Sequence, residues 1–214
     1  MLISELHKRI FLLILPVILS ITCAFVFRQL ANLFGNKCGY FFGFLFYWLF
    51  WCFFVPVSFI GMKSIVRLFA VKKLFTDGTV LICLLTPLVF VYLYAFLPLI
   101  RKESFEIIIL SLLLSTVNAT FEEVLWRAVY FKIFKQQKYL GIVASSVGFA
   151  IWHYAPQVVF TNSNPGGANS FVIFAFILGL AYSFVVWKQQ SIFWVTIAHI
   201  LFDFGGLGAR IYLG

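Results

Sequence analysis

The sequence predicts an all-α protein, a polytopic transmembrane helical bundle of about seven helices with eight as the alternative. Apolar residues are 63% of the 214 residues and charged residues only 11%. Phe alone occurs 29 times, which is more than one soluble domain of this length could bury. The apolar residues also fall in runs of roughly 20 residues, the length at which a helix crosses a bilayer. We therefore expect an integral membrane protein embedded in the lipid bilayer.

The expected spans follow one another along the chain. They cover residues 10–27, 40–60, 79–100, 105–134, 140–156, 170–187 and 192–207. The first run follows two basic residues as in a signal peptide, but it is long enough to span and no small-residue cleavage site follows, so we expect a retained helix. The fourth run is too long for one perpendicular span; tilt, projection beyond the bilayer or a break near Asn118 would accommodate it, and a break gives eight helices. Because no repeat or linker interrupts the pattern, residues 1–214 are expected to form a single membrane domain.

The basic residues indicate the orientation and exclude one class of partner. Lys and Arg are more frequent before the first span and in the second, fourth and sixth loops than on the opposite side, which predicts a cytoplasmic amino terminus. The chain carries 16 Lys and Arg against 7 Asp and Glu. These charges punctuate the apolar runs and do not gather on one face, so nucleic acid is not an expected partner.

A small set of polar residues lies inside the predicted spans, where a charge without a partner costs several kcal/mol. The set consists of Glu122, Glu123 and Arg127 on the fourth span, His153 on the fifth, and His199 and Asp203 on the seventh. Glu123 and Arg127 are four residues apart, so they share a helix face and can pair. Glu122 points about 100° away from Glu123 and stays available for another partner. His199 and Asp203 repeat the four-residue spacing and can address a common cavity.

Helix geometry places three of these residues at similar depth. With a rise of 1.5 Å per residue, Glu122, His153 and His199 lie roughly 15, 20 and 12 Å from the ends of their helices on one predicted side of the membrane. All three therefore fall near the middle of the bilayer. We expect them to converge.

A glutamate and two imidazoles can hydrolyse an amide in two ways. They can bind zinc with a fourth position for water, or act without metal, with the glutamate as base and the imidazoles polarising a carbonyl. The sequence contains no GxSxG, no HExxH and no glycine-rich phosphate loop. Glu122, His153 and His199 are the candidate ligands if zinc is the cofactor, and the residues alone leave this choice open.

Three segments together resemble the CAAX-protease and bacteriocin-processing intramembrane proteases, also called the CPBP or Abi family. The family pattern is EExxxR on one helix, FxxxH on the next, and HxxxN or a close variant on a later one. The corresponding segments here are Glu122–Arg127, Phe149–His153 and His199–Asp203. Each motif alone is weak, but three in this order on three membrane helices are specific. The resemblance covers residues 105–207, the expected motif-bearing catalytic core.

The resemblance implies an intramembrane endopeptidase acting on a membrane-associated protein or peptide. Its catalytic residues would be Glu122, which activates water, His153, which shares that water or a metal, and His199 with Asp203, which form an oxyanion-stabilising or second ligand group. Glu123 and Arg127 would support the site. Asp203 stands where many members have Asn. Because an ionised Asp cannot donate a hydrogen bond to an oxyanion, orienting His199 or adding a ligand is its more plausible role.

Two other classes of protein fit parts of the pattern. A bacteriocin-immunity protein would bind a peptide toxin without cleaving it, and would not need an intact catalytic glutamate. A proton-coupled transporter also uses acids and histidines inside the membrane, but it typically distributes them along a path and often carries an inverted repeat, neither of which the sequence shows. Individually, the Glu123–Arg127 pair and the two histidines also fit structural roles in helix packing. The whole set at matching depth favours the protease.

Overall fold

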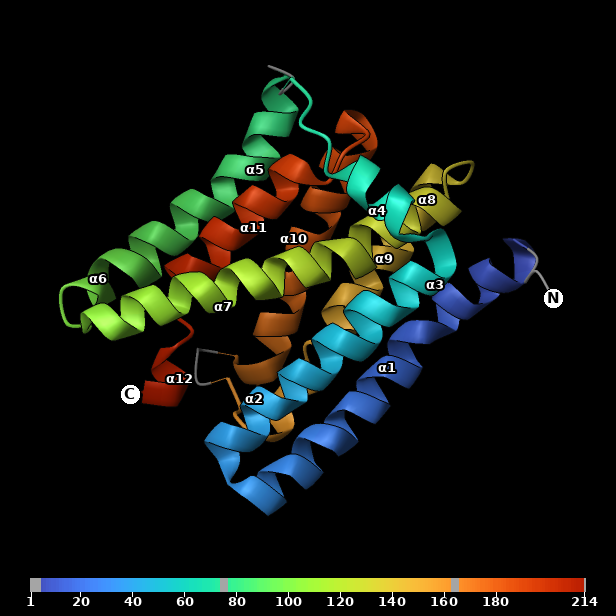
Figure 1. Cartoon of the computed structure of the whole chain (residues 1–214). Coiled ribbons are helices and arrows are strands. Elements are labelled where there is room, and N and C mark those ends of the chain that lie inside the picture. Colours follow the sequence, from blue (N-terminus) through green and yellow to red (C-terminus); the bar gives the residue numbers. More distant parts are fainter. Residues whose placement is uncertain (1–4, 74–76, 163–165, 214) are drawn as a thin grey trace.

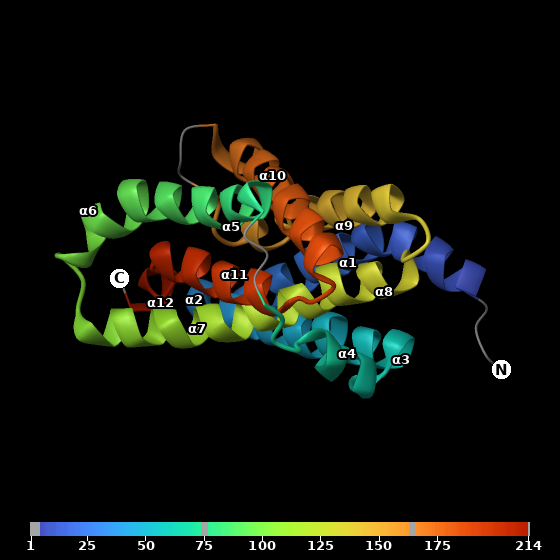
Figure 2. The ribbon, with the colours of Figure 1, turned by 90° about the horizontal axis from the view of Figure 1, so that it is seen from above.

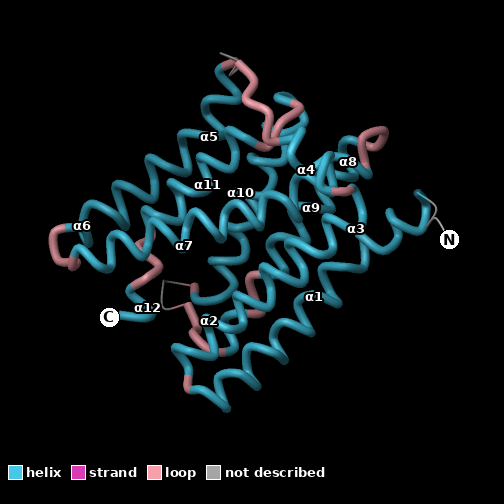
Figure 3. The backbone as a smooth tube through the Cα atoms, viewed as in Figure 1, coloured by secondary structure: helices cyan, strands magenta, loops and turns pink. Residues whose placement is uncertain are grey.

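The structure is a computed structural model that describes residues 5–73, 77–162 and 166–213, and within these ranges it contains helices and no strand (Figures 1 and 3). The helices in chain order are α1 (Glu5–Phe34), α2 (Asn36–Phe46), η1 (Tyr47–Phe54), α3 (Val55–Ile60), α4 (Met62–Leu68), α5 (Gly78–Val91), η2 (Tyr92–Phe96), α6 (Leu97–Ile100), α7 (Phe105–Glu123), η3 (Val124–Val129), α8 (Tyr130–Ile133), α9 (Lys138–Trp152), η4 (Pro156–Val158), α10 (Gly167–Gln189), α11 (Phe193–Gly205) and α12 (Arg210–Leu213). Segments η1, η2 and η3 are π-helical and continue the α-helices on either side. The predicted all-α bundle is confirmed.

Five of these continuous helices are long and apolar enough to cross a membrane. They are Glu5–Phe34, Asn36–Ile60, Gly78–Ile100, Phe105–Ile133 and Gly167–Gln189. The two remaining predicted spans correspond to the shorter helices α9 and α11. The described ranges also contain the short helices α4 and α12, and α7 passes through Asn118 without the break that an eighth span would have required.

The outer surface of the bundle is apolar, as expected for an integral membrane protein. On α1, for example, Leu13, Val17 and Phe25 are all exposed. Contiguous apolar surface of this kind is rare on soluble proteins because it stays in contact with water. In a membrane this apolar surface contacts the hydrocarbon chains of the lipids and not water.

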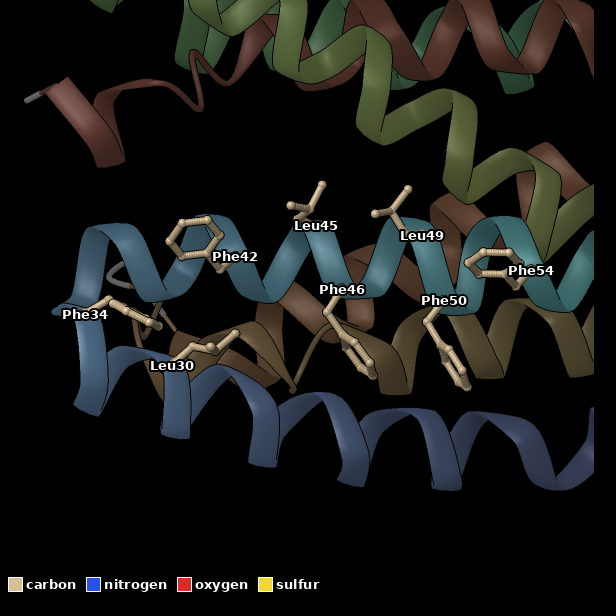
Figure 4. A pocket seen from close by; sticks show the side chains of 8 residues that line it. All are labelled: Leu30, Phe34, Phe42, Leu45, Phe46, Leu49, Phe50 and Phe54. Atoms are coloured by element: carbon tan, nitrogen blue, oxygen red, sulfur yellow. The ribbon is translucent and has the colours of Figure 1, made fainter.

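An open groove of about 510 Å³ runs along this outer surface between α1 and the α2–η1–α3 helix (Figure 4). All of its lining residues are Leu or Phe, and Phe46 and Phe50 point from the second helix toward α1. The groove is suited to hydrocarbon. None of the buried polar residues singled out in the sequence lines it, so the candidate site lies elsewhere.

The first two helices form a close hairpin because two glycines permit the turn and the contact. Gly35, between α1 and α2, has φ +79°, a left-handed conformation that favours glycine. A Cβ placed on Gly39 would lie 2.3 Å from the backbone nitrogen of Ala31. The two helices can therefore approach at their backbones and run side by side (Figures 1 and 2).

The end of α7 and its continuation η3 are enclosed by other helices, and every residue of η3 is buried. Helix α11 packs between α5 and α7, while η1 and α3 pack on another side of the α7–η3 helix (Figures 1 and 2). Helices α9 and α10 pack against each other and also contact η3. Side chains at the junction of α7 and η3 can therefore meet side chains from η1, α9, α10 and α11.

Candidate active site

The two adjacent glutamates lie at the junction of α7 and η3. Glu122 and Glu123 are the last two residues of α7, and both are buried. From Val124 the backbone changes to π-helical hydrogen bonding, which continues to Val129. Single π-helical turns within α-helices are frequent at functional sites.

One carboxylate oxygen of Glu122 is held by two donors from other helices. The indole nitrogen Nε1 of Trp152, at the end of α9, donates to Oε1 over 2.8 Å. The Tyr47 hydroxyl donates to the same oxygen over 3.2 Å and itself accepts a 2.8 Å hydrogen bond from Trp126 Nε1. The Tyr47 and Trp152 rings are stacked with centroids 3.5 Å apart. Oε1 is therefore fixed in position and its hydrogen-bonding capacity is largely used.

The second oxygen of Glu122 has only long contacts. His199 Nε2 lies 3.7 Å from Oε2, and Asn118 Nδ2 lies 3.4 Å from it. These separations are at or beyond the range of a good hydrogen bond. The two oxygens of Glu122 are thus in different environments, and Oε2 is the one that can accept a proton or bind a small molecule.

Glu123 links Arg127 to His199. Its Oε2 lies 3.3 Å from Arg127 Nε, and its Oε1 lies 2.8 Å from His199 Nδ1. The first contact is an ion pair by distance but lacks the alignment of a hydrogen bond. The Arg127 guanidinium also lies 4.2 Å from the centroid of the Phe149 ring, a cation–π contact. The expected pairing of Glu123 with Arg127 is present, and Glu123 also contacts His199 on α11.

His199 stands between three carboxylates. In addition to Glu123 at Nδ1, its Nε2 lies 3.4 Å from Asp203 Oδ1 and 3.7 Å from Glu122 Oε2. Only the imidazolium form can donate from both ring nitrogens. The Asp203 side chain is 23% exposed, whereas those of Glu122 and His199 are each 2% exposed. Asp203 is therefore on the more accessible side of the cluster.

His153 is oriented differently from the other predicted site residues. It follows α9 directly, and its Nδ1 contacts the carbonyl oxygen of Phe149 one turn earlier. A carbonyl can only accept, so Nδ1 carries the proton and Nε2 of the neutral ring is an acceptor. Its ring packs edge-on against Phe149 and Phe171. No hydrogen bond joins His153 to Glu122 among the described residues; the neighbouring Trp152 donates one to Glu122 instead.

The site includes partners that the sequence did not single out. Tyr47 and Trp152 bind Oε1 of Glu122, and Trp48 Nε1 donates to Asn118 Oδ1 over 2.9 Å. Asn118 in turn donates to Asp203 Oδ2 over 2.9 Å. Asn118 lies one helical turn before Glu122, a spacing that could have drawn attention to it. The aromatic partners carry no such signal in a chain with 29 Phe, 9 Tyr and 6 Trp.

The residues expected to bind zinc are not arranged as a ligand set. Over the described ranges, no group of three or more His, Cys, Asp or Glu side chains is placed to hold a metal ion. Within the described ranges no hydrogen bond or ion pair joins His153 to Glu122 or His199. The three expected ligands are therefore not brought together as one set, and the reaction proposed below uses no metal.

Fold and site together define an integral membrane protein with an acid–base cluster enclosed in a helical bundle. Residues 104–205 match the family described as type II CAAX prenyl endopeptidase Rce1-like. This match confirms the CPBP/Abi family resemblance for the segment that contains all three motifs, and at family level it supports a CAAX-type protease of the membrane. No curated protein and no solved structure matches the chain.

Proposed function

We propose that the protein is an intramembrane endopeptidase that hydrolyses a peptide bond of a membrane-associated substrate with water activated by Glu122. The observation that carries this proposal is the difference between the two oxygens of Glu122. Oε1 is held by Trp152 and Tyr47, while Oε2 has only contacts of 3.4 Å and longer. A carboxylate held through one oxygen presents the other in a fixed direction, as a general base requires.

In this mechanism Oε2 of Glu122 accepts a proton from water, and the hydroxide formed attacks the scissile carbonyl carbon. The acceptor nitrogen Nε2 of His153 can hold the second hydrogen of the same water. When the C–N bond breaks, Glu122 returns its proton to the leaving amine, so the carboxylate is regenerated. One water is consumed, and one carboxyl and one amino terminus are formed.

His199 is suited to stabilise the oxygen of the tetrahedral intermediate. Its Nδ1 is held by Glu123 at 2.8 Å, which fixes the direction of the ring. The Nε2–H faces Asp203 and Glu122 only at 3.4 and 3.7 Å, so a closer carbonyl oxygen can replace these contacts. In this proposal Asp203 orients and stabilises the imidazolium, since a carboxylate cannot donate to an oxyanion.

The decisive variant is Glu122→Gln, which keeps the shape of the side chain and removes its basicity. We expect at least about a 1,000-fold loss of cleavage of a quenched-fluorescence peptide with a farnesylated CAAX terminus, and an unchanged melting temperature in detergent. Glu106→Gln, on the exposed first turn of α7, is the matched control and should cleave normally. Near-normal turnover by a folded Glu122→Gln protein would contradict the proposal. An immunity function based on contact alone should survive this substitution.

The same pair of proteins can reveal the natural substrate. Membrane proteomes from cells that contain wild-type or Glu122→Gln protein should differ by a substrate that is shortened only with the wild type. Farnesylated proteins, peptide-toxin precursors and leader peptides are the three classes to compare.

A further inference from the structure

A hydrogen-bonded relay connects Trp48 on η1 to both carboxylates that face His199 Nε2. Trp48 Nε1 donates to Asn118 Oδ1 over 2.9 Å, and Asn118 Nδ2 donates to Asp203 Oδ2 over 2.9 Å. The same amide nitrogen lies 3.4 Å from Glu122 Oε2. Because an indole nitrogen can only donate, the oxygen of Asn118 must face Trp48 and its NH₂ group must face the carboxylates.

We infer that Asn118 is a positioning residue for the hydrolysis proposed above, and that Trp48 sets its orientation. The amide holds Asp203 through Oδ2, so that Oδ1 is directed to His199. Asp203 is partly exposed, and without this restraint its side chain could adopt other rotamers. The positioning role of Asn118 in catalysis rests on the proposed function. The hydrogen bonds from Trp48 to Asn118 and from Asn118 to Asp203 do not depend on it.

The Asn118 amide also lies between the carboxylates of Glu122 and Asp203. The amide of Asn118 lies against one oxygen of Asp203 and one of Glu122. The amide nitrogen lies 3.4 Å from Oε2, a long hydrogen bond that leaves Oε2 able to accept from a water as well. Asn118 thus stabilises two neighbouring negative charges without occupying the position at which water is activated.

Trp48 brings the first half of the chain into the site. It lies outside the segment that matches the family, as does its neighbour Tyr47, which binds Oε1 of Glu122. Consecutive residues of η1 therefore direct two different groups, with Tyr47 acting on Glu122 and Trp48 acting through Asn118 on Asp203. The amino-terminal helices contribute to the geometry of the site in addition to enclosing it.

The relay can be tested by NMR independently of any substrate. The indole ¹⁵N–¹H resonance of Trp48 is assigned by its loss in Trp48→Phe. We expect it to shift in Asn118→Leu, which removes the acceptor, and also in Asp203→Asn, which changes the group two hydrogen bonds away. The resonance of Trp51, three residues further along η1 and outside the relay, should stay unchanged. A Trp48 signal that moves in neither variant would overturn the relay.

The consequence for catalysis is tested with the farnesylated peptide. In Asn118→Leu we expect kcat to fall about tenfold while KM changes less than about twofold, because one hydrogen bond to a charged group is lost. Asn118→Asp should be more severe, and adding Asp203→Asn should recover part of the loss because an amide–carboxylate pair is restored. Thr116→Val, on the exposed face of the same helix, is the control expected to match wild type.

The outcomes separate the two proposals. If wild type cleaves the peptide and Asn118→Leu retains its kcat, Asn118 has no positioning role and the inference fails while the proposed function stands. If wild type cleaves no peptide in any substrate class, the proposed function fails. The indole resonances then still decide whether the relay exists.

Discussion

The Trp152 indole donates to Oε1 of Glu122 over 2.8 Å, so the residue that anchors the candidate base immediately precedes the predicted catalytic histidine. His153 Nδ1 is directed back to its own helix by the Phe149 carbonyl. The end of α9 therefore places two groups at adjacent positions. The Trp152 indole restrains the carboxylate, and the neutral His153 ring keeps Nε2 as an acceptor.

Removing the indole N–H should impair catalysis more than it impairs folding. In Trp152→Phe we expect kcat to fall about 10- to 100-fold, since a hydrogen bond to a charged group contributes about 1.5–3 kcal/mol. Tyr47→Phe should have a smaller effect, because its 3.2 Å contact is longer and Trp152 remains. Trp194→Phe also removes a 2.8 Å indole hydrogen bond, to the Lys72 carbonyl at an exposed position, and should leave kcat unchanged. An equal loss of kcat in the Trp152→Phe and Trp194→Phe variants would argue against a specific role of Trp152 in holding Glu122.

The buried pair of Glu123 and Arg127 should show strong coupling. Arg127→Leu removes one partner of a buried ion pair and should destabilise the protein by about 3–5 kcal/mol, measured by thermal unfolding in detergent. Adding Glu123→Gln should recover part of this loss. Strictly additive effects in the double-mutant cycle would show that the pair does not interact.

Activity should not recover in parallel with stability in that cycle. Glu123 also holds His199 Nδ1 at 2.8 Å, so Glu123→Gln loosens the group proposed to stabilise the oxyanion. We expect the double variant to be more stable than Arg127→Leu but no more active. Full recovery of turnover would mean that the orientation of His199 does not depend on the charge of Glu123.

Metal removal should leave turnover intact. Among the described residues, Glu122, His153 and His199 do not form a ligand set that could hold a metal ion. We expect chelator-treated protein, freed of metal as verified by elemental analysis, to cleave the farnesylated peptide at the rate of untreated protein. Near-stoichiometric zinc that is lost in both His153→Ala and His199→Ala would show that the two rings converge on a metal.

Outside the membrane-spanning helices, Asp77 should make stability depend on pH. It caps α5 by accepting from the Thr79 backbone N–H, and it pairs with Lys188 at 3.2 Å. The Thr79 hydrogen bond, with Lys188 as the next contribution, lowers the pKa of Asp77 below its usual value. A lowered pKa in the folded state stabilises the protein above the unfolded-state pKa, and this contribution is lost as the pH falls through the folded-state pKa.

The matched variant for this effect is Asp77→Asn, which can still cap the helix but carries no charge. Its melting temperature should be lower than that of wild type at pH 7, and the difference should shrink toward pH 3. Asp77→Ala should be lower still at pH 7 because the cap is also lost. A constant difference between wild type and Asp77→Asn across this range would contradict the assignment.

The sequence could predict the spans and the pairs within one helix because both depend on local spacing. Apolar runs gave the helices, and four-residue spacing gave the contacts of Glu123 with Arg127 and of His199 with Asp203. The similar depth of Glu122 and His199 also followed from the helical rise, and their side chains lie 3.7 Å apart. The cytoplasmic orientation of the amino terminus remains a prediction.

The remainder of the site depends on contacts between helices that are distant in the sequence. Trp48 meets Asn118 across 70 residues, and Tyr47 meets Glu122 across 75. No local pattern selects these two aromatic residues from the many on the same helix. Depth alone also could not predict the orientation of His153, since that is set by a hydrogen bond to the preceding turn.

The π-helical segment η3 has a consequence for how the sequence can change during evolution. A π-helical turn contains one residue more than the α-helical turn it replaces, and Val124–Val129 lie between the two glutamates and the rest of their helix. Because the wide turn holds its extra residue locally, deleting one residue there would give regular α-helix and leave the helix beyond it close to its present orientation. A one-residue change of length in the regular α-helix between Asn118 and Glu122 would instead rotate the two glutamates by about 100° relative to Asn118. We therefore expect a change of length to be tolerated better in η3 than in the α-helical turn before it.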